Sequence, residues 1–396
     1  MERRDFIQLT GLGALLGGAG VASAQGDDKG GEGKKLTRGF PSVMAPRADG
    51  AEVLWRVNGL SKGYVEYGTT EKLGSVQKND GTGLLPAGEQ SLRVRLDGLK
   101  PATKYFYRVV TETFDRKTLQ QEKGEIRSFR TLAPEAETSA FTCWNDTHKH
   151  KETIKKLAPL SKPSDFLVWN GDICNDWYKE NEAVDTILTP AEGVDLTAKH
   201  PLVVLRGNHD FRGTRAFELE DIHATHDGTP WSAFRSGPIA VICMDTGEDK
   251  PDDHKHLFGR VACEPMREEQ AAWLKEVIER PEMKDAPYKL VFCHLPLRWI
   301  NETTDYGYDY YSKRSRDLWH KSLVKWGAQM VISGHTHRDA YLPPKEGFPY
   351  AQLVGGGPKE NQARVIEGTA NMKELTITMK DLSGKETRKH VIKNGA

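Results

Sequence analysis

The fold prediction rests on nine consecutive residues, Leu202-Val203-Val204-Leu205-Arg206-Gly207-Asn208-His209-Asp210. Four apolar residues, typical of a buried strand, are followed directly by a turn of polar side chains. The same order, an apolar run ending in Asp, Asn or His, occurs at five other places, residues 140–148, 166–172, 239–245, 290–294 and 330–337. Amphipathic helical patterns lie among them, over 268–280 and 318–326. This alternation predicts βαβ units and a mostly parallel sheet, an α/β fold.

The polar residues at the six predicted strand ends are not residues that a hydrophobic core requires. Open α/β sheets bind their ligands at the carboxyl ends of the strands. Five of the 13 histidines fall in these turns, at positions 148, 209, 294, 335 and 337. Asp245 ends the fourth strand, and we expect a structural role for it. The pattern therefore predicts a functional site where the strands end.

Taken in order, the strand ends contain five motifs: Asp146-x-His148, Gly171-Asp172, Gly207-Asn208-His209-Asp210, His294 and Gly334-His335-x-His337. The series resembles the calcineurin-like metallophosphoesterase superfamily, over residues 140–345. The resemblance implies a four-layer αββα core that binds two divalent or trivalent metal ions, Fe, Mn or Zn, which suit mixed imidazole and carboxylate ligands. It also implies that Asp172 bridges the metals, that a first site is completed by Asp146, His148 and His337, and that a second is completed by Asn208, His294 and His335.

The same resemblance implies the chemistry. A metal-bridging hydroxide would attack phosphorus in line, with Asp172 and His209 as the catalytic residues. His209 would stabilise the charged transition state or protonate the leaving oxygen. Asp210 is expected to orient a histidine. Purple acid phosphatases have an iron-binding tyrosine where this chain has Asn175, so we expect no tyrosinate colour.

The sequence is less informative about substrate recognition. We expect Arg212, with Asn208, to contact a phosphate oxygen, because guanidinium groups bind such anions bidentately. Surface ion pairs are the expectation for Arg206, Arg215 and Arg298. The aromatic segment 299–311 beside His294 fits either stacking on a substrate or a packed lid. His254 and His256 are expected to face solvent.

Residues 38–131 contain short alternating strands, such as 92–96, without helical periodicity, which predicts an all-β sandwich. The run Leu99-x-Pro101-x-Thr103-x-Tyr105-x-Tyr107 resembles the tyrosine corner of fibronectin type III domains. Together with Val65-Glu66-Tyr67-Gly68, it resembles the N-terminal sandwich of purple-acid-phosphatase-like enzymes. Residues 139–396 are the predicted metallophosphoesterase domain, including its C-terminal strands.

Residues 1–24 combine Arg3-Arg4, a glycine-rich apolar run and Ala22-Ser23-Ala24, a pattern that resembles a twin-arginine (Tat) signal peptide. A periplasmic or extracellular location and no stable membrane anchor after cleavage are therefore expected, with a transmembrane anchor as the alternative. Residues 25–37 are rich in Gly and charged side chains, which predicts a flexible linker.

Composition restricts the partners. The chain has 56 basic and 56 acidic residues and a net charge of +0, which argues against binding to a nucleic-acid duplex. The five cysteines lack zinc-site spacing and are expected to be small buried residues. The prediction is an exported phosphomonoesterase for a small phosphorylated substrate. The alternatives are a phosphodiesterase acting on nucleotides or lipid head groups and a non-catalytic surface binding protein; the oligomeric state stays open.

Overall fold

The computed structural model describes residues 35–114, 119–226, 228–300 and 307–395, and Lys35–Ala396 forms one compact unit. The predicted signal peptide, residues 1–24, lies outside the described residues, as does most of the predicted linker. Within the described part of the chain, no helix is long and apolar enough to cross a bilayer.

Two sheets form the centre of the chain. The first has nine strands in the order β21-β20-β19-β10-β11-β12-β1-β2-β6, and the second has six in the order β13-β14-β15-β16-β18-β17. Their inner neighbours run parallel: β10 (Thr138–Trp144), β11 (Phe166–Asn170) and β12 (Leu202–Leu205) in the first sheet, and β14 (Ile239–Met244), β15 (Tyr288–Cys293), β16 (Met330–Ser333) and β18 (Ala351–Val354) in the second. The predicted parallel α/β core is confirmed.

Antiparallel strands complete both sheets. Besides β2 and β6, which belong to the N-terminal part of the chain and are described below, they are β13 (Ser232–Ser236), β17 (Ala340–Leu342), β19 (Val365–Asn371), β20 (Glu374–Lys380) and β21 (Glu386–Lys393). The last three extend the first sheet beyond β10, so the C-terminus of the chain packs on the same layer as the motif-bearing strands.

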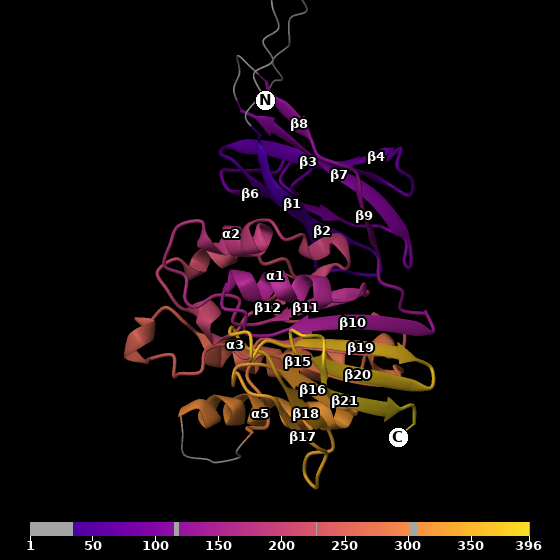
Figure 1. Ribbon diagram of the computed structural model, residues 1–396, viewed down its shortest axis with the longest axis vertical. Helices are drawn as coiled ribbons and strands as arrows, with labels where there is room; N and C mark the ends of the chain where they lie inside the picture. The colour runs from indigo at the N-terminus through magenta and orange to yellow at the C-terminus, as the bar shows by residue number, and fades with distance from the viewer. Residues whose placement is uncertain (1–34, 115–118, 227, 301–306, 396) are drawn as a thin grey trace, which may run out of the picture. The chain divides into compact units, whose positions relative to one another are not determined.

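The two sheets pack face to face and helices cover their outer faces, which gives the predicted four layers (Figure 1). Phe141 and Phe292 meet between the sheets, with ring centroids 5.4 Å apart. The helices α1 (Lys151–Leu160) and α2 (Glu182–Leu188) cover the first sheet, whereas α3 (Cys263–Val277), α4 (Pro281–Lys284) and α5 (Gly307–Trp326) lie along the second. Strands enclosed on both faces need apolar residues at every position, which explains their continuous apolar runs.

Helix α3 begins five residues earlier than its apolar pattern predicts. The carboxylate of Asp252 accepts hydrogen bonds from the backbone nitrogens of Cys263 and Glu264, both at 3.0 Å. These are two of the amides that a helix N-terminus leaves without a partner. The capping residue is eleven positions away, so a search for a local cap does not find it.

The N-terminal part of the chain is rich in strands and consistent with a β-sandwich. Its strands are β1 (Thr37–Met44), β2 (Ala51–Val57), β3 (Ser61–Gly68), β4 (Ser75–Gln77), β5 (Ala87–Gly88), β6 (Ser91–Leu96), β7 (Lys104–Thr113), β8 (Gln121–Lys123) and β9 (Arg127–Arg130). β1, β2 and β6 face a third sheet of β3, β4, β5, β7, β8 and β9 across a shared apolar core. β1 also pairs in parallel with β12 through Met44 and Leu202, so the first sheet continues into this region.

Two details of the sequence are visible here. The Tyr105 hydroxyl accepts a hydrogen bond of 2.9 Å from the backbone nitrogen of Lys100, five residues upstream, which is the bond of a tyrosine corner. The five cysteines are free and buried, and burial raises the pKa of each thiol. They are the small buried residues expected from their setting.

Candidate metal centre and active site

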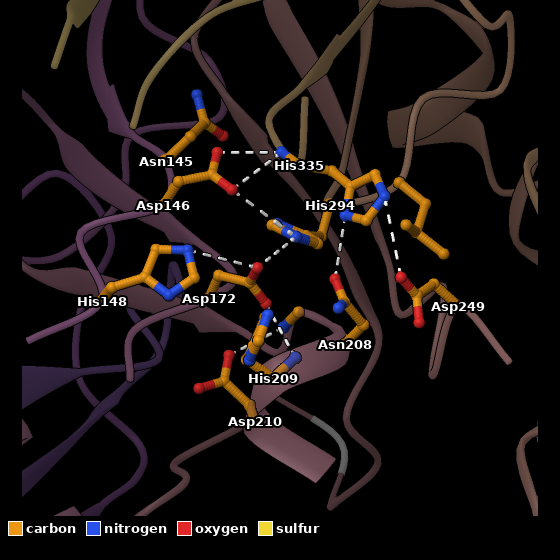
Figure 2. Close-up of polar contacts among 12 residues, drawn as sticks. Asn145, Asp146, His148, Asp172, Asn208, His209, Asp210, Asp249, His294 and His335 are labelled. Carbon is orange, nitrogen blue, oxygen red and sulfur yellow. Dashed lines mark hydrogen bonds and ion pairs between the residues drawn. The ribbon is translucent and has the colours of Figure 1, made fainter. Parts of the chain in front are cut away.

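The carboxyl ends of strands from both sheets converge on one place (Figure 2). The turns after β10, β11 and β12 bring Asp146, His148, Asp172, Asn208 and His209, and the turns after β15 and β16 bring His294, His335 and His337. Two groups of these side chains could each hold a metal ion, one of Asp146, His148, Asp172 and His337 and one of Asp172, His294 and His335. Asp172 is common to both groups, and the candidate ligand atoms of each group lie within 4.8 Å of one another.

The candidate ligand atoms of each group lie close to one another. In the first group, His148 Nε2 lies 3.1 Å from His337 Nε2 and 3.5 Å from Asp172 Oδ2, and His337 Nε2 lies 3.4 Å from Asp146 Oδ1. In the second, His294 Nε2 lies 3.2 Å from Asp172 Oδ2. The structure thus brings together six of the seven residues implied as ligands in these two groups.

The seventh residue, Asn208, lies beside the second group. Its Oδ1 is 2.9 Å from His335 Nδ1. An amide oxygen and an imidazole nitrogen that face each other can both bind one cation. All seven implied positions therefore meet at one place.

His294 provides a test of whether the residues fit a cation. Its side chain is fully buried, Nδ1 lies 3.0 Å from the backbone oxygen of Asn170, and Nε2 is buried without a hydrogen-bond partner. Burial lowers the pKa of His294, but the charges of Asp172 and Asp146 outweigh burial and raise it to about 10. The two carboxylates therefore favour positive charge beside His294, which a bound metal ion would also supply. The donor set fits a dinuclear centre, and its metals are not identified by the donors.

The backbone at these positions is strained in a consistent way. Asp146, His148, Asp172, His335 and His337 all have positive φ angles, between 45° and 68°. Side chains other than glycine rarely adopt this region, and such strain is concentrated at functional sites. The left-handed turns aim successive side chains back toward the strand ends, which regular strand geometry would not do.

Two glycines allow the site to be this compact. A Cβ atom at Gly207 would lie 2.3 Å from the backbone nitrogen and Oδ1 of Asp172, and one at Gly334 would lie 2.2 Å from Asp146 Oδ2. Any larger residue would displace a candidate ligand. These two glycines are thus required for close approach of the backbone to the candidate ligands.

A pair of buried amides fixes the strand ends relative to one another. Asn170 Nδ2 donates to Asn145 Oδ1 at 2.8 Å and to the backbone oxygens of Cys293 and Ile332, both at 3.2 Å. Asn145 Nδ2 in turn donates to the backbone oxygen of Gly355. This network joins the ends of strands from the two sheets directly behind the candidate ligands.

His209 has a carboxylate partner that the sequence analysis missed. His209 Nδ1 lies 2.7 Å from Asp176 Oδ1, and the backbone nitrogen of His209 donates to Asp172 Oδ1 at 2.9 Å. Burial lowers the pKa of His209, but the hydrogen bond to Asp176 and the charge of Asp172 give a net increase. The only sequence signal for Asp176 is an acidic residue four positions after Asp172, which is common in any polar turn.

The expected role of Asp210 is wrong. Its carboxylate accepts hydrogen bonds from the backbone nitrogens of Gly207, at 2.8 Å, and of Ile173 and Cys174, each at 3.3 Å. These bonds tie the turn after β12 to the turn after β11. Asp210 therefore shapes the two loops that present Asp172, Asn208 and His209, and it does not orient an imidazole.

An open cavity of about 360 Å³ lies over the candidate ligands. It is lined by Asp172, Asn208, His209, Arg212, Asp249, Trp299, Ile300, His335, Thr336, His337 and Arg338. The Trp299 ring lies 5.8 Å from that of His335. Residues 301–306, and the side chains of 307–311, lie outside the described part of the chain, so the expected role of the aromatic segment 299–311 stays a prediction.

The arginines separate into different roles. Arg212 lines the cavity, with Nη1 3.3 Å from His209 Nε2. Arg206 pairs with the buried Asp245 at 2.7 Å, and Arg215 pairs with Glu218. The expected surface position of Arg298 is wrong, because this residue is 2% exposed, and its Nη1 donates to the backbone oxygens of Pro343 and Tyr350. His256 is exposed and His254 is half-buried beside it.

Comparison with known proteins places this site in a family. Residues 140–339 match the calcineurin-like phosphoesterase family. The serine/threonine-protein phosphatase CPPED1 of Mus musculus is 26% identical over 199 residues, which are 49% of this chain and 59% of the relative. Purple acid phosphatase 15 of Arabidopsis thaliana is 22% identical over 316 residues, 74% of this chain and 56% of the relative. The chain thus spans less than two thirds of the length of these relatives.

Two solved structures share the fold. Purple acid phosphatase PPD1 from yellow lupin (Lupinus luteus) has a TM-score of 0.65 and 12% identity, covering 90% of this chain and 74% of that chain. PhoD has a TM-score of 0.61 and 12% identity, covering 92% of this chain and 90% of that chain. Since the family match includes about half of the residues and every candidate ligand, the chain belongs to the calcineurin-like phosphoesterase family.

Proposed function

We propose that the chain is an exported dinuclear-metal phosphoesterase that hydrolyses small phosphomonoesters. The observation on which the proposal rests is the convergence of two donor groups through Asp172, with His209 and Arg212 facing the same cavity. Two relatives, CPPED1 and purple acid phosphatase 15, are named as phosphatases, which supports a monoester substrate.

Each group of residues has a physical role in this proposal. Bound metal ions would supply positive charge for the phosphoryl oxygens and lower the pKa of water, the nucleophile. Asp146, His148, Asp172, Asn208, His294, His335 and His337 would hold them. His209, held through Nδ1 by Asp176, keeps Nε2 toward the cavity and can give a proton to the leaving oxygen. Arg212 can donate to a non-bridging phosphoryl oxygen.

The complete donor set favours an enzyme over a binding protein on an inactive scaffold. Fourteen of the described non-glycine residues have positive φ angles, and five of these are candidate ligands. A binding protein would not need this strain at its candidate ligands. The cavity of about 360 Å³ is open to solvent, which suits a small substrate.

The first experiment is elemental analysis of protein purified without added metal, followed by assays with 4-nitrophenyl phosphate and bis(4-nitrophenyl) phosphate. We expect about two metal ions per chain and faster hydrolysis of the monoester. Asp172→Ala is the matched control for metal binding. A faster diester reaction would replace the monoesterase proposal by a phosphodiesterase, and absence of metal and of activity after addition of Mn, Fe or Zn would overturn the enzyme proposal.

We also propose that the chain is exported through the Tat pathway and that residues 38–131 form a fibronectin-III-like domain. The Arg3-Arg4 pair supports the first proposal and the Tyr105 corner supports the second. N-terminal sequencing of exported protein should begin near Gln25, and replacement of Arg3-Arg4 by two lysines should prevent export. Export of the lysine variant at the normal rate would contradict the Tat assignment.

A further inference from the structure

Arg212 is held from behind by two buried carboxylates. Its Nε donates to Glu248 Oε2 at 2.7 Å, and its Nη2 donates both to Glu248 Oε1 and to Asp249 Oδ1. The side chains of Glu248 and Asp249 are 0% and 2% exposed, whereas that of Arg212 is 16% exposed. A bidentate contact of this kind fixes the plane of the guanidinium group.

The segment that contains the two carboxylates is itself firmly anchored. It follows β14, and α3 contacts its backbone at three positions. Gln270 accepts from the backbone nitrogen of Asp245 at 2.8 Å, and Arg267 donates to the backbone oxygens of Thr246, at 3.0 Å, and of Glu248. Arg267 and Gln270 are fully buried. The position of the Glu248 carboxylate is therefore set by the second sheet and its covering helix.

Arg212 keeps N–H donors that Glu248 and Asp249 do not occupy. A guanidinium group has five N–H donors. The contacts with Glu248 and Asp249 use the one on Nε and the two on Nη2. The remaining two N–H groups are on Nη1, which lies 3.3 Å from His209 Nε2 and 3.5 Å from His209 Nδ1, beside the cavity that Asp172 and Asn208 also line.

We propose that Glu248 is a positioning residue that fixes Arg212 so that its Nη1 donates to a phosphoryl oxygen of the substrate beside His209. The proposal rests on the proposed phosphoesterase function and adds a residue to it. Glu248 lies outside every motif of the strand ends and does not line the cavity. Its carboxylate acts through Arg212, since its other contacts are the backbone nitrogen of Asp249, at 2.8 Å, and the Nζ of Lys250, at 3.8 Å, and Lys250 does not line the cavity. Asp249 has a second neighbour, His335 Nε2 at 4.0 Å, so Glu248 gives the cleaner test.

The chain offers a matched control three residues away. Asp245 is fully buried in the same segment and accepts a hydrogen bond of 2.7 Å from Arg206 Nε. Arg206 lies over the Phe211 ring, 4.3 Å from its centroid, and neither Arg206 nor Asp245 lines the cavity. A general effect of losing a buried carboxylate should therefore appear in both Glu248→Gln and Asp245→Asn, whereas an effect on phosphate should appear in Glu248→Gln alone.

The experiment measures binding of inorganic phosphate to the metal-loaded full chain by calorimetry, with metal content determined in parallel. We expect Glu248→Gln to weaken phosphate about tenfold with unchanged metal content, as is typical when an orienting partner is removed. Glu248→Asp keeps the charge but withdraws the carboxylate, and should weaken phosphate by a smaller factor. In an Arg212→Ala background, Glu248→Gln should change the affinity less than about twofold, because the residue it positions is gone.

Three results would overturn the proposal. They are wild-type phosphate affinity in both Glu248 variants, an equal loss from Glu248→Gln with and without Arg212, and an equal loss in Asp245→Asn. The assay does not depend on turnover. If no ester is hydrolysed but phosphate binding still depends on Glu248 through Arg212, the positioning role stands and the proposed function fails.

Discussion

The amino and carboxyl ends of the parallel strands in the first sheet both border a cavity, but they differ in hydrogen bonding and in backbone strain. At the amino ends of β10 and β11 lies an open cavity of about 610 Å³, lined among others by Ser139 and Asp165, whereas the cavity at the carboxyl ends is about 360 Å³. Both are polar. At the amino end the polar groups satisfy one another, since Asp165 Oδ2 accepts from Ser139 Oγ and from the backbone nitrogen of Ala140, each at 2.9 Å.

At the carboxyl end some groups pair, such as Asn208 Oδ1 with His335 Nδ1 at 2.9 Å, but one buried imidazole nitrogen has no hydrogen-bond partner. His294 Nε2 is buried and lacks a hydrogen-bond partner, and five candidate ligands have positive φ angles. None of the residues that line the amino-end cavity has a positive φ angle. Converging lone pairs and backbone strain therefore identify the functional end, because both raise the free energy of the folded chain unless a cation is bound there.

The strongest test of this comparison is Asp172→Ala. This change removes the one carboxylate common to both donor groups. We expect metal content to fall and hydrolysis of 4-nitrophenyl phosphate to drop to background. Elemental analysis and activity on the same sample provide the check, and retention of both metals with activity would show that the shared position is not essential.

His209→Ala should have the next largest effect. The variant should keep its metal content, because His209 belongs to neither donor group, but turnover should fall about 10²–10⁴-fold, as for loss of a general acid. The loss should be larger for an alkyl phosphate than for 4-nitrophenyl phosphate, since the poorer leaving group needs the proton more. An equal loss on both substrates would argue for a purely electrostatic role.

Asp176→Asn should give a smaller loss in the same direction, about 10–100-fold. The amide cannot supply the negative charge that Asp176 places 2.7 Å from His209 Nδ1. The measurement is kcat for the two leaving groups, alone and combined with His209→Ala. If Asp176 acts through His209, the double variant should be no slower than His209→Ala; a further decrease would show a separate role.

At the amino end, Asp165→Ala should leave kcat/KM within about twofold of the wild type and lower the free energy of unfolding by about 1–3 kcal/mol, since it leaves polar groups without their acceptor. Urea denaturation and the monoester assay measure the two quantities. A large loss of activity with unchanged stability would show that the amino-end cavity also binds substrate.

The last prediction concerns His200, near the amino ends of the strands. Its Nδ1 lies 3.1 Å from Ser164 Oγ. Burial, with a contribution from Lys199, lowers the pKa of His200 to about 4. The unfolded chain therefore binds a proton between pH 6.5 and 4 that the folded chain does not, so the free energy of unfolding falls as the pH falls. From pH 7 to 5 the contribution is about 2 kcal/mol. His200→Asn should reduce the difference between urea denaturation at the two pH values, and an unchanged difference would contradict the assignment.

Prediction from the sequence succeeded where the signal is local. Asp172 and Asn208 lie two and three residues after an apolar strand, and the parallel sheet rule then brings their side chains to one edge. It failed where a residue's partner comes from another element. Asp210 and Arg298 look like an acidic turn residue and a surface arginine until the backbone groups that they contact are known.

The sequence by itself determined the α/β class and the order of the strand-end motifs, because both depend on hydrophobic periodicity and on residues next to a strand. The candidate ligands were implied by the resemblance of those motifs to a known family. Only the tertiary structure decided that Asp176 contacts His209 and that Glu248 holds Arg212. These contacts join the turn after β11 to the turn after β12, and the turn after β12 to the segment after β14. Which side chains meet across two loops depends on how the sheets pack and on which left-handed turns the strained backbone adopts, and neither is encoded in a short stretch of residues.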